Sequence, residues 1–186
     1  MKRLFDIFFS LIAIAIFSLP IIIIAALIFL SSKGPPIYWS KRVGINNVTF
    51  KMPKFRTMFI NTPDVASHLL KDPNILITPI GRILRKTSLD EIPQLYSILI
   101  GDMSFVGPRP ALYNQEDLIK LRSDKRIDNL IPGLTGWSQI NGRDELSIEE
   151  KVNYDYEYLQ KRSLLFDIYI IYKTIINTLK QIGVSH

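Results

Sequence analysis

The sequence contains no cysteine and only two histidines among its 186 residues. The lack of cysteine excludes disulfides and thiolate metal sites, which fits a reducing compartment. Two histidines do not favour a metal site built from several imidazoles. The sequence also has no glycine-rich dinucleotide fingerprint, Walker A loop, His-Glu zinc motif or nucleophile-elbow serine. The chemistry must therefore be sought among carboxylates and basic residues.

Basic residues outnumber acidic ones, 23 to 17, which gives a formal net charge of +6. This excess favours anionic partners such as phospholipid headgroups, nucleotides or phosphates, although solubility alone also explains it. Nucleic acid is not favoured, because no basic run is interleaved with aromatic residues. The length allows a membrane anchor over residues 1–33 and one domain over residues 34–186, large enough to bury a core.

Residues 7–30 form a run of 24 residues without a formal charge. Such a run is typical of a membrane segment, and as a straight helix it would be about 36 Å long. It is too long for the apolar part of a cleaved signal peptide, and no small-x-small cleavage site follows it. We therefore expect it to remain in the mature protein.

Pro20 interrupts this run, where it removes a helical hydrogen bond. Ser18 lies beside it and can satisfy a freed carbonyl. Basic residues flank both ends, namely Lys2 and Arg3 before the run and Lys33, Lys41 and Arg42 after it. Because basic flanks prefer the cytoplasmic side, we expect a re-entrant helix that breaks near Pro20 and returns. One ordinary kinked span is the alternative.

The rest of the chain predicts an α+β fold that is predominantly helical. Strands at Ile37–Trp39 and Thr49–Met52, with a turn at Asn46–Asn47, predict a small β-hairpin. Residues 102–110 read as a rigid loop. The predicted helices cover residues 80–86, 92–100, 113–129, 147–161 and 166–182, and a short strand is predicted at 138–140. The last helix is amphipathic, so it either packs on the core or lies in the membrane interface.

Asp90 and Glu91 are the best candidates for catalysis. They are adjacent carboxylates at the expected start of a short helix, where free backbone N–H groups favour anions. A carboxylate is a competent nucleophile toward phosphorus, and two neighbouring carboxylates can hold Mg²⁺. The competing interpretation is structural, because Ser88 to Glu91 also matches the spacing of a helix capping box.

Basic side chains in segments punctuated by glycine or proline strengthen the catalytic interpretation. Arginine pairs with phosphate oxygens in a fork geometry, and the prolines of Gly107–Pro110 would preset the direction of one guanidinium. Each basic residue alone is more often a solvated charge. As a set around two carboxylates they predict a site for a phosphorylated substrate and a metal; the set is Lys54, Arg56, Arg82, Arg85, Arg109 and Arg143.

Several segments recur together in one known family. They are the Lys2-Arg3 start, the apolar run with Ser18 and Pro20, Arg42–Gly44, Lys54–Met58, Leu89–Pro110 and Pro132–Arg143. With them the sequence resembles the bacterial sugar transferases, small monotopic phosphoglycosyl transferases of the bacillosamine-phosphate transferase type. The resemblance covers nearly the whole chain, and its last two blocks are the specific ones.

The resemblance implies transfer of a sugar 1-phosphate from a nucleotide diphosphate sugar, usually UDP-linked, to polyprenyl phosphate. It implies Mg²⁺, a covalent intermediate on Asp90 with Glu91 as its partner, and substrate or phosphate binding by Arg56, Arg85, Arg109 and Arg143. It further implies a re-entrant helix breaking at Pro20 and a cytoplasmic catalytic domain at the bacterial inner membrane. The reaction would begin the assembly of a surface or glycoprotein glycan.

Two other functions are compatible with the same residues. A non-catalytic membrane scaffold would use the basic cluster to bind anionic lipid, with Asp90 and Glu91 only capping a helix. A phosphatase acting on a lipid or nucleotide sugar would use water as the acceptor.

Overall fold

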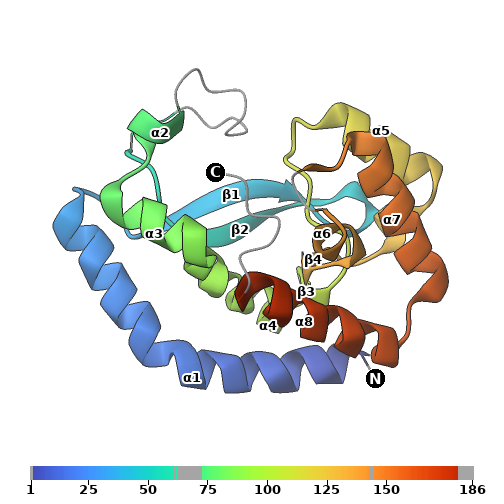
Figure 1. The fold of residues 1–186 in the computed structure, drawn as a ribbon, viewed down its shortest axis with the longest axis horizontal. Helices are drawn as coiled ribbons and strands as arrows, with labels where there is room; N and C mark the ends of the chain where they lie inside the picture. Colours follow the sequence, from blue (N-terminus) through green and yellow to red (C-terminus); the bar gives the residue numbers. More distant parts are fainter. Residues whose placement is uncertain (1, 61, 63–72, 143–144, 180–186) are drawn as a thin grey trace.

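The computed structural model describes residues 2–60, 62, 73–142 and 145–179. Its first element is the helix α1, Lys2–Ser31, which contains Pro20. Figure 1 shows that α1 bends near its middle and lies along one edge of the molecule. The helix continues through the bend, because a proline removes only one helical hydrogen bond. Ser18 Oγ donates to the carbonyl of Ala15 at 2.8 Å, next to the Ile16 carbonyl that Pro20 leaves without its usual donor.

Most of α1 is exposed and apolar. Only 11 % of an 18-residue apolar stretch of this helix is buried, whereas the core helix of a soluble protein is mostly buried. Among the described residues it is the one helix long and apolar enough to cross a membrane. The side chains that it does bury are Asp6, Ser10, Ile24 and Ile28. The α+β fold with an N-terminal membrane helix is therefore confirmed.

The predicted hairpin is present and longer than the sequence indicated. Strand β1, Ile37–Val43, pairs antiparallel with β2, Thr49–Phe55, with Ser40 opposite Met52. The 3₁₀ turn η1, Ile45–Asn47, joins them. Both asparagines have positive φ angles, 52° for Asn46 and 59° for Asn47, a conformation that asparagine tolerates better than most residues.

A second, parallel pair of strands was not predicted. Strand β3, Ser104–Val106, lies in the segment expected to be a loop, and it pairs with β4, Gly133–Thr135. The pairing needs a glycine, because a Cβ at Gly133 would come within 2.1 Å of the Gly107 nitrogen. The strand predicted at residues 138–140 is wrong: that segment forms the short helix α6, Trp137–Ile140.

The remaining elements are helical and largely match the expectations. They are α2 (Pro73–Leu76), α3 (Pro79–Thr87), η3 (Leu89–Gln94), α4 (Leu95–Ile100), α5 (Glu116–Asp124), η4 (Ile127–Asn129), α7 (Ile148–Lys161) and α8 (Leu164–Leu179). A capping box begins α7, where Ser147 and Glu150 exchange side-chain to backbone hydrogen bonds. The predicted end of the last helix lies outside the described residues.

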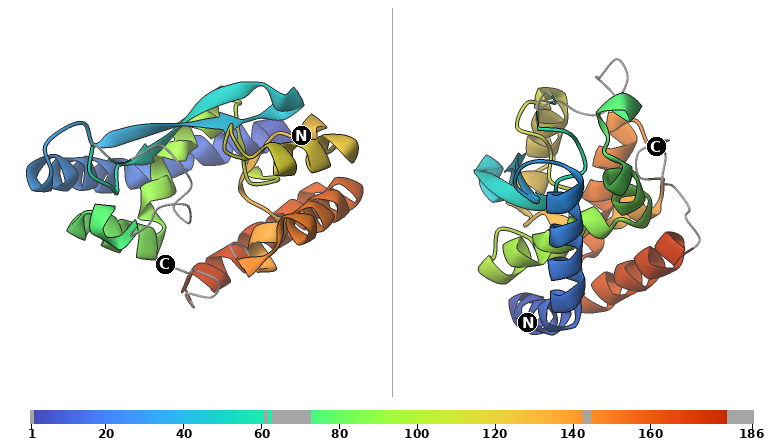
Figure 2. Two further views of the ribbon diagram at one scale, coloured as in Figure 1. Left: turned by 90° about the horizontal axis from the view of Figure 1, so that it is seen from above. Right: turned by 90° about the vertical axis from the view of Figure 1, so that its left-hand side faces the viewer.

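The core consists of hydrophobic clusters that join these elements into one body. The largest joins β3, α5, α7 and α8 around Val106, Val152 and Ile170. Another places Ile24 and Ile28 of α1 against Phe55 and Leu84. Figure 2 shows the hairpin and α8 on opposite sides of the molecule, with α4 between them.

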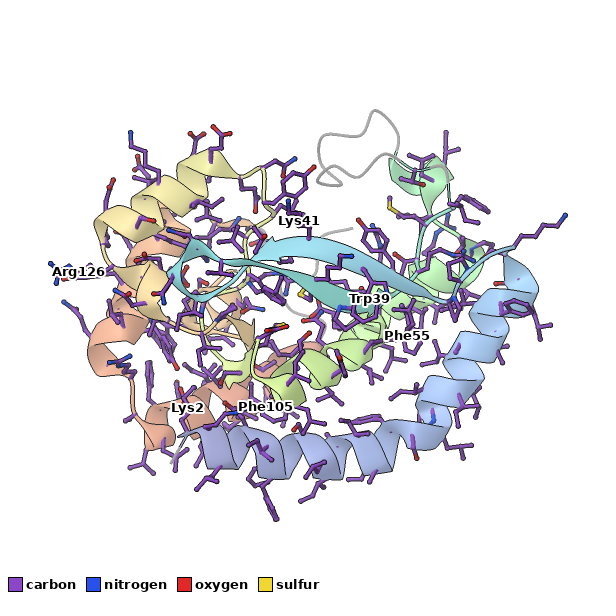
Figure 3. The ribbon with its side chains drawn as sticks, turned by 180° about the vertical axis from the view of Figure 1, so that it is seen from behind. Lys2, Trp39, Lys41, Phe55, Phe105 and Arg126 are labelled. Atoms are coloured by element: carbon purple, nitrogen blue, oxygen red, sulfur yellow. The ribbon has the colours of Figure 1, made fainter. Side chains whose placement is uncertain are left out.

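Both ends of α1 are fixed to this body by polar contacts. At the first end, Lys2 Nζ pairs with Asp167 of α8 at 2.5 Å, and Arg3 donates to the carbonyls of Ile98 and Leu99 in α4, at 2.6 Å each. Figure 3 shows Lys2 and Phe105 at this same end of α1. At the other end, Arg56 Nη2 donates to the carbonyl of Ser32 at 2.8 Å.

Candidate active site

The dyad Asp90–Glu91 lies in the 3₁₀ turn η3, which leads without a gap into α4. Ser88, just before it, has the left-handed conformation with φ 56° and makes no side-chain capping bond. The capping-box interpretation of Ser88 and Glu91 is therefore wrong, because the Glu91 nitrogen bonds to the Ser88 carbonyl and not to its hydroxyl. A structural role at a helix start does not explain the two carboxylates.

Glu91 binds two cations from distant parts of the chain. Its Oε1 accepts from Lys54 Nζ of β2 at 2.9 Å and from Arg109 Nη2 at 2.7 Å. The Glu91 side chain is only 12 % exposed. Burial alone would raise the pKa of Glu91, but the charges of Arg109 and Lys54 outweigh it and hold this pKa well below its ordinary range. Glu91 is therefore ionised at neutral pH.

Asp90 has a different environment. Burial raises the pKa of Asp90; the charge of Glu91 acts in the same direction, and Lys54, Arg109 and Arg85 oppose both. Arg85 comes from the last turn of α3, where its Nε donates to Thr57 Oγ1 at 3.0 Å. The environment thus pushes the pKa values of two adjacent carboxylates apart, which is how active sites give equivalent groups different roles.

Lys54 belongs to the same charge cluster. Burial lowers the pKa of Lys54, Arg109 acts in the same direction, and Glu91 and Asp90 oppose the shift. For Arg85, burial also lowers the pKa and Asp90 opposes it. Desolvated cations around carboxylates interact strongly with any further anion that enters. The cluster therefore suits a substrate with several phosphate oxygens.

The segment that carries Arg109 is held from two sides, as its prolines led us to expect. The Gly107 nitrogen donates to the Thr135 carbonyl and the Gly133 nitrogen donates to the Pro108 carbonyl, both at 2.9 Å. On the other side, Arg122 Nη1 of α5 donates to the Arg109 carbonyl at 2.8 Å. The guanidinium of Arg109 therefore extends from a fixed backbone toward Glu91.

No sequence pattern predicted the network around Arg122. Its Nε and Nη2 donate to Asp155 Oδ2 of α7 at 3.0 and 2.6 Å, and Ser138 Oγ of α6 donates to Asp155 Oδ1 at 2.9 Å. The Asp155 side chain is 1 % exposed. Because the three residues are separated in the sequence and lie in ordinary polar segments, no local pattern indicated this contact.

The other predicted basic residues have varied positions. Arg56 is buried and bonds to the carbonyl and hydroxyl of Ser32, and within the described part of the chain its Nε and Nη1 have no partner. Arg82 is exposed on α3, as a solvated charge would be. Arg143 lies outside the described residues. The structure therefore brings Lys54, Arg85 and Arg109 to the dyad, and uses Arg56 at the end of α1.

The donor set at the dyad fits Mg²⁺ better than a transition metal. In the described ranges, no group of three or more histidine, aspartate or glutamate side chains is arranged to hold an ion by itself. Mg²⁺ commonly takes one or two protein carboxylates and completes its coordination with water and substrate phosphates. Two adjacent carboxylates beside a cationic pocket match that pattern.

Comparison with known proteins gives one consistent result. A family model described as bacterial sugar transferase matches residues 1–181. The exopolysaccharide production protein ExoY of Rhizobium meliloti is 39 % identical over 193 aligned positions, covering 94 % of this chain and 83 % of that protein. The uncharacterized sugar transferase EpsL of Bacillus subtilis is 37 % identical over 187 positions, covering 100 % of this chain and 90 % of that protein.

A longer relative has a more specific name. The UDP-glucose:undecaprenyl-phosphate glucose-1-phosphate transferase of Escherichia coli is 38 % identical over 184 positions, covering 94 % of this chain and 39 % of that protein. The similarity thus reaches from the apolar N-terminal helix through the dyad to the C-terminal helix.

Proposed function

Because the chain belongs to the bacterial sugar transferase family, we propose that it transfers a sugar 1-phosphate from a UDP-linked sugar to undecaprenyl phosphate. The observation that carries the proposal is the dyad, with Glu91 bound to Lys54 and Arg109 and with Asp90 in their combined field. The product would be a lipid-linked sugar diphosphate, the starting unit of a glycan. The names of the relatives support both substrates.

The proposed reaction has two displacements at phosphorus. An Asp90 oxygen attacks the sugar-bearing phosphorus, the bond to the bridging oxygen breaks, and the nucleoside monophosphate leaves with that oxygen. A phosphate oxygen of undecaprenyl phosphate then attacks the same phosphorus, the bond to Asp90 breaks, and the carboxylate is restored. Asp90 fits the nucleophile because its raised pKa makes its oxygen more basic than that of Glu91.

The cations address the main electrostatic difficulty of this chemistry, which is the approach of one anion to another. Lys54 and Arg109 are held on Glu91, so their positions are fixed before the substrate arrives. Arg85 of α3 lies close enough for its charge to interact with that of Asp90. Mg²⁺, held by Asp90 and Glu91, would supply further neutralisation of the diphosphate charge. Glu91 thus orients cations and remains ionised.

We also propose that α1 is re-entrant at the inner membrane, with both ends and the catalytic domain on the cytoplasmic side. The support is that Lys2 and Ser32, which lie on either side of the apolar run of residues 7–30, contact the same folded body. A span with its ends on opposite sides would have to break one of these sets of contacts. A cysteine placed before Lys2 should resist a membrane-impermeant thiol reagent added from the periplasm; labelling there would establish a simple span.

The decisive experiment follows the two displacements separately. Purified protein with Mg²⁺ and a radiolabelled UDP-sugar should release uridine monophosphate and retain label on the protein without acceptor. Asp90→Asn should abolish both, whereas Asp128→Asn on η4 should retain both. If uridine monophosphate were released continuously without acceptor and no label stayed on the protein, the enzyme would be a phosphatase. No release with any of a panel of UDP-sugars, together with lipid binding independent of Mg²⁺, would establish a scaffold.

A further inference from the structure

Beside the dyad there is a cavity of about 310 Å³ that extends to the membrane helix. Its lining includes Glu91 of the dyad, Ala13 and Phe17 of α1, and Ile171 and Ile175 of α8. Ligand pockets in proteins usually begin at about this size. From this cavity we infer that the chain of the lipid acceptor enters the protein, with its phosphate-proximal isoprene units lying between α1 and α8. The inference rests on the proposed function and adds to it the location of the acceptor.

The cavity wall is predominantly apolar, and three of its polar side chains are already hydrogen-bonded, whereas the buried Gln139 Oε1 has no partner among the described residues. Thr135 Oγ1 and Thr174 Oγ1 share a hydrogen bond of 2.6 Å, and Asn177 Nδ2 donates to the Ile140 carbonyl at 3.3 Å. The Thr135 and Thr174 hydroxyls and the Asn177 amide nitrogen are therefore already engaged, which leaves few groups in this wall to bind the hydroxyls of a sugar. A hydrocarbon chain gives up no hydrogen bonds when it enters such a cavity. A sugar would give up most of the hydrogen bonds that its hydroxyls make with water.

The two ends of the lining have different chemistry. Glu91 is bound to Lys54 and Arg109, so this end carries the cations that attract phosphate. Ala13 and Phe17 belong to α1, whose outer face exposes apolar residues such as Ile16 and Leu19. An amphiphile with a phosphate head and a hydrocarbon tail matches this gradient. Among lipids, the acceptor is the one whose phosphate must reach the dyad.

The kink of α1 explains why this space exists. The first part of the helix is held to α4 by Arg3, and the part after Pro20 packs on Phe55 and Leu84 through Ile24 and Ile28. Ala13 and Phe17 lie between these two attachments. A small residue at position 13 leaves room that a larger side chain would fill. The membrane helix therefore contributes part of the cavity wall, and the catalytic domain supplies the rest.

The test fills the cavity and measures the two displacements separately. Ala13→Phe and Ile175→Trp should raise the KM for undecaprenyl phosphate by about tenfold or more, since one group of methylene size in an apolar pocket already has such effects. Both variants should form the labelled intermediate on Asp90 at the wild-type rate, which also shows that they are folded. The controls are Ile12→Phe and Ile168→Trp, on the same helices at positions that do not line the cavity.

A direct measurement makes the result independent of turnover. A short prenyl phosphate with a photoreactive group on its first isoprene unit should cross-link to α1 or α8 residues of the cavity, and excess undecaprenyl phosphate should compete. Cross-links confined to the outer face of α1 would overturn the inference, as would unchanged acceptor KM in both variants. A loss confined to the donor step would assign the cavity to the sugar. If wild-type protein forms no intermediate, the proposed function fails, and the cross-links still decide the cavity.

Discussion

Replacement of Lys54 by methionine tests the charge arrangement of the dyad most directly. Lys54 Nζ lies 2.9 Å from Glu91 Oε1, and the two side chains are 15 % and 12 % exposed. At an effective dielectric constant of about 20, this separation corresponds to an attraction of about 6 kcal/mol. Part of it offsets the desolvation of Lys54, whose pKa burial lowers, and Arg109 still contacts Glu91 in the variant.

The expected loss lies at the lower end of the range for breaking a buried ion pair, about 3 kcal/mol. For a protein of this size that corresponds to a fall in Tm of about 6–12 °C. Thermal unfolding in the same detergent measures it. The control is Lys51→Met, because Lys51 is an exposed lysine on the same strand. An equal fall in both variants would refute the reasoning.

The difference in Tm between the wild type and Lys54→Met should depend on pH with a definite sign. The folded protein holds the pKa of Glu91 below its ordinary value, so the stabilisation is present above the ordinary pKa and is lost as the pH falls through the folded one. Without Lys54 the folded pKa of Glu91 rises. The difference in Tm should therefore be full at neutral pH and shrink in acid, once Glu91 becomes protonated in the variant. A difference that grew on acidification would contradict this assignment.

Two further substitutions test the support of the site. Arg122→Met leaves the buried Asp155 carboxylate without its cation and should cost about 3–5 kcal/mol, whereas Lys120→Met, an exposed change on the same helix, should cost little; equal unfolding curves would refute the network. Gly133→Ala places a Cβ within 2.1 Å of the Gly107 nitrogen and should cost about 3 kcal/mol. The comparison is Gly44→Ala, whose Cβ would lie 3.1 Å from both a ring carbon of Phe50 and the Val48 carbonyl oxygen, a much milder contact, and a larger loss there would contradict the backbone argument.

Features determined by neighbouring residues could be predicted from the sequence. The uncharged run gave α1, the pair Asn46–Asn47 gave the hairpin turn with two positive φ angles, and Ser147 gave the start of α7. Each depends on a local preference for a conformation or a hydrogen bond. The bend at Pro20 also follows from one residue, although the sequence suggested a break where the helix continues.

Features that depend on distant partners could not be predicted in the same way. The pairing of β3 with β4 joins short segments whose glycines and prolines read locally as turns. Asp6 shows the difficulty most clearly: it lies next to the apolar run, yet it is buried and its Oδ1 accepts from Ser104 Oγ and the Phe105 nitrogen at 3.1 Å each. Nothing near it in the sequence indicates those partners.

The candidate site falls between these two cases. The positions of the basic residues in segments that contain glycine or proline predicted a set around Asp90 and Glu91. They did not predict which of these residues contact the dyad. The structure brings Lys54 and Arg109 into contact with Glu91, and it brings Arg85 close enough for its charge to lower the pKa of Asp90. The choice follows from tertiary packing, because β2 and the segment after β3 approach η3 from different directions.

The attachments of α1 imply that the membrane helix sets the height of the dyad. At one end, Arg3 bonds to the last turn of α4, the helix that continues directly from the dyad turn η3. At the other end, Arg56 bonds to Ser32, and the next residue, Thr57, accepts from Arg85. A displacement of α1 relative to the bilayer would therefore move both the turn that carries Asp90 and the segment that holds Arg85. In the proposed reaction between a soluble donor and a lipid acceptor, such a fixed connection would keep Asp90 at one depth, which a flexible tether would not do.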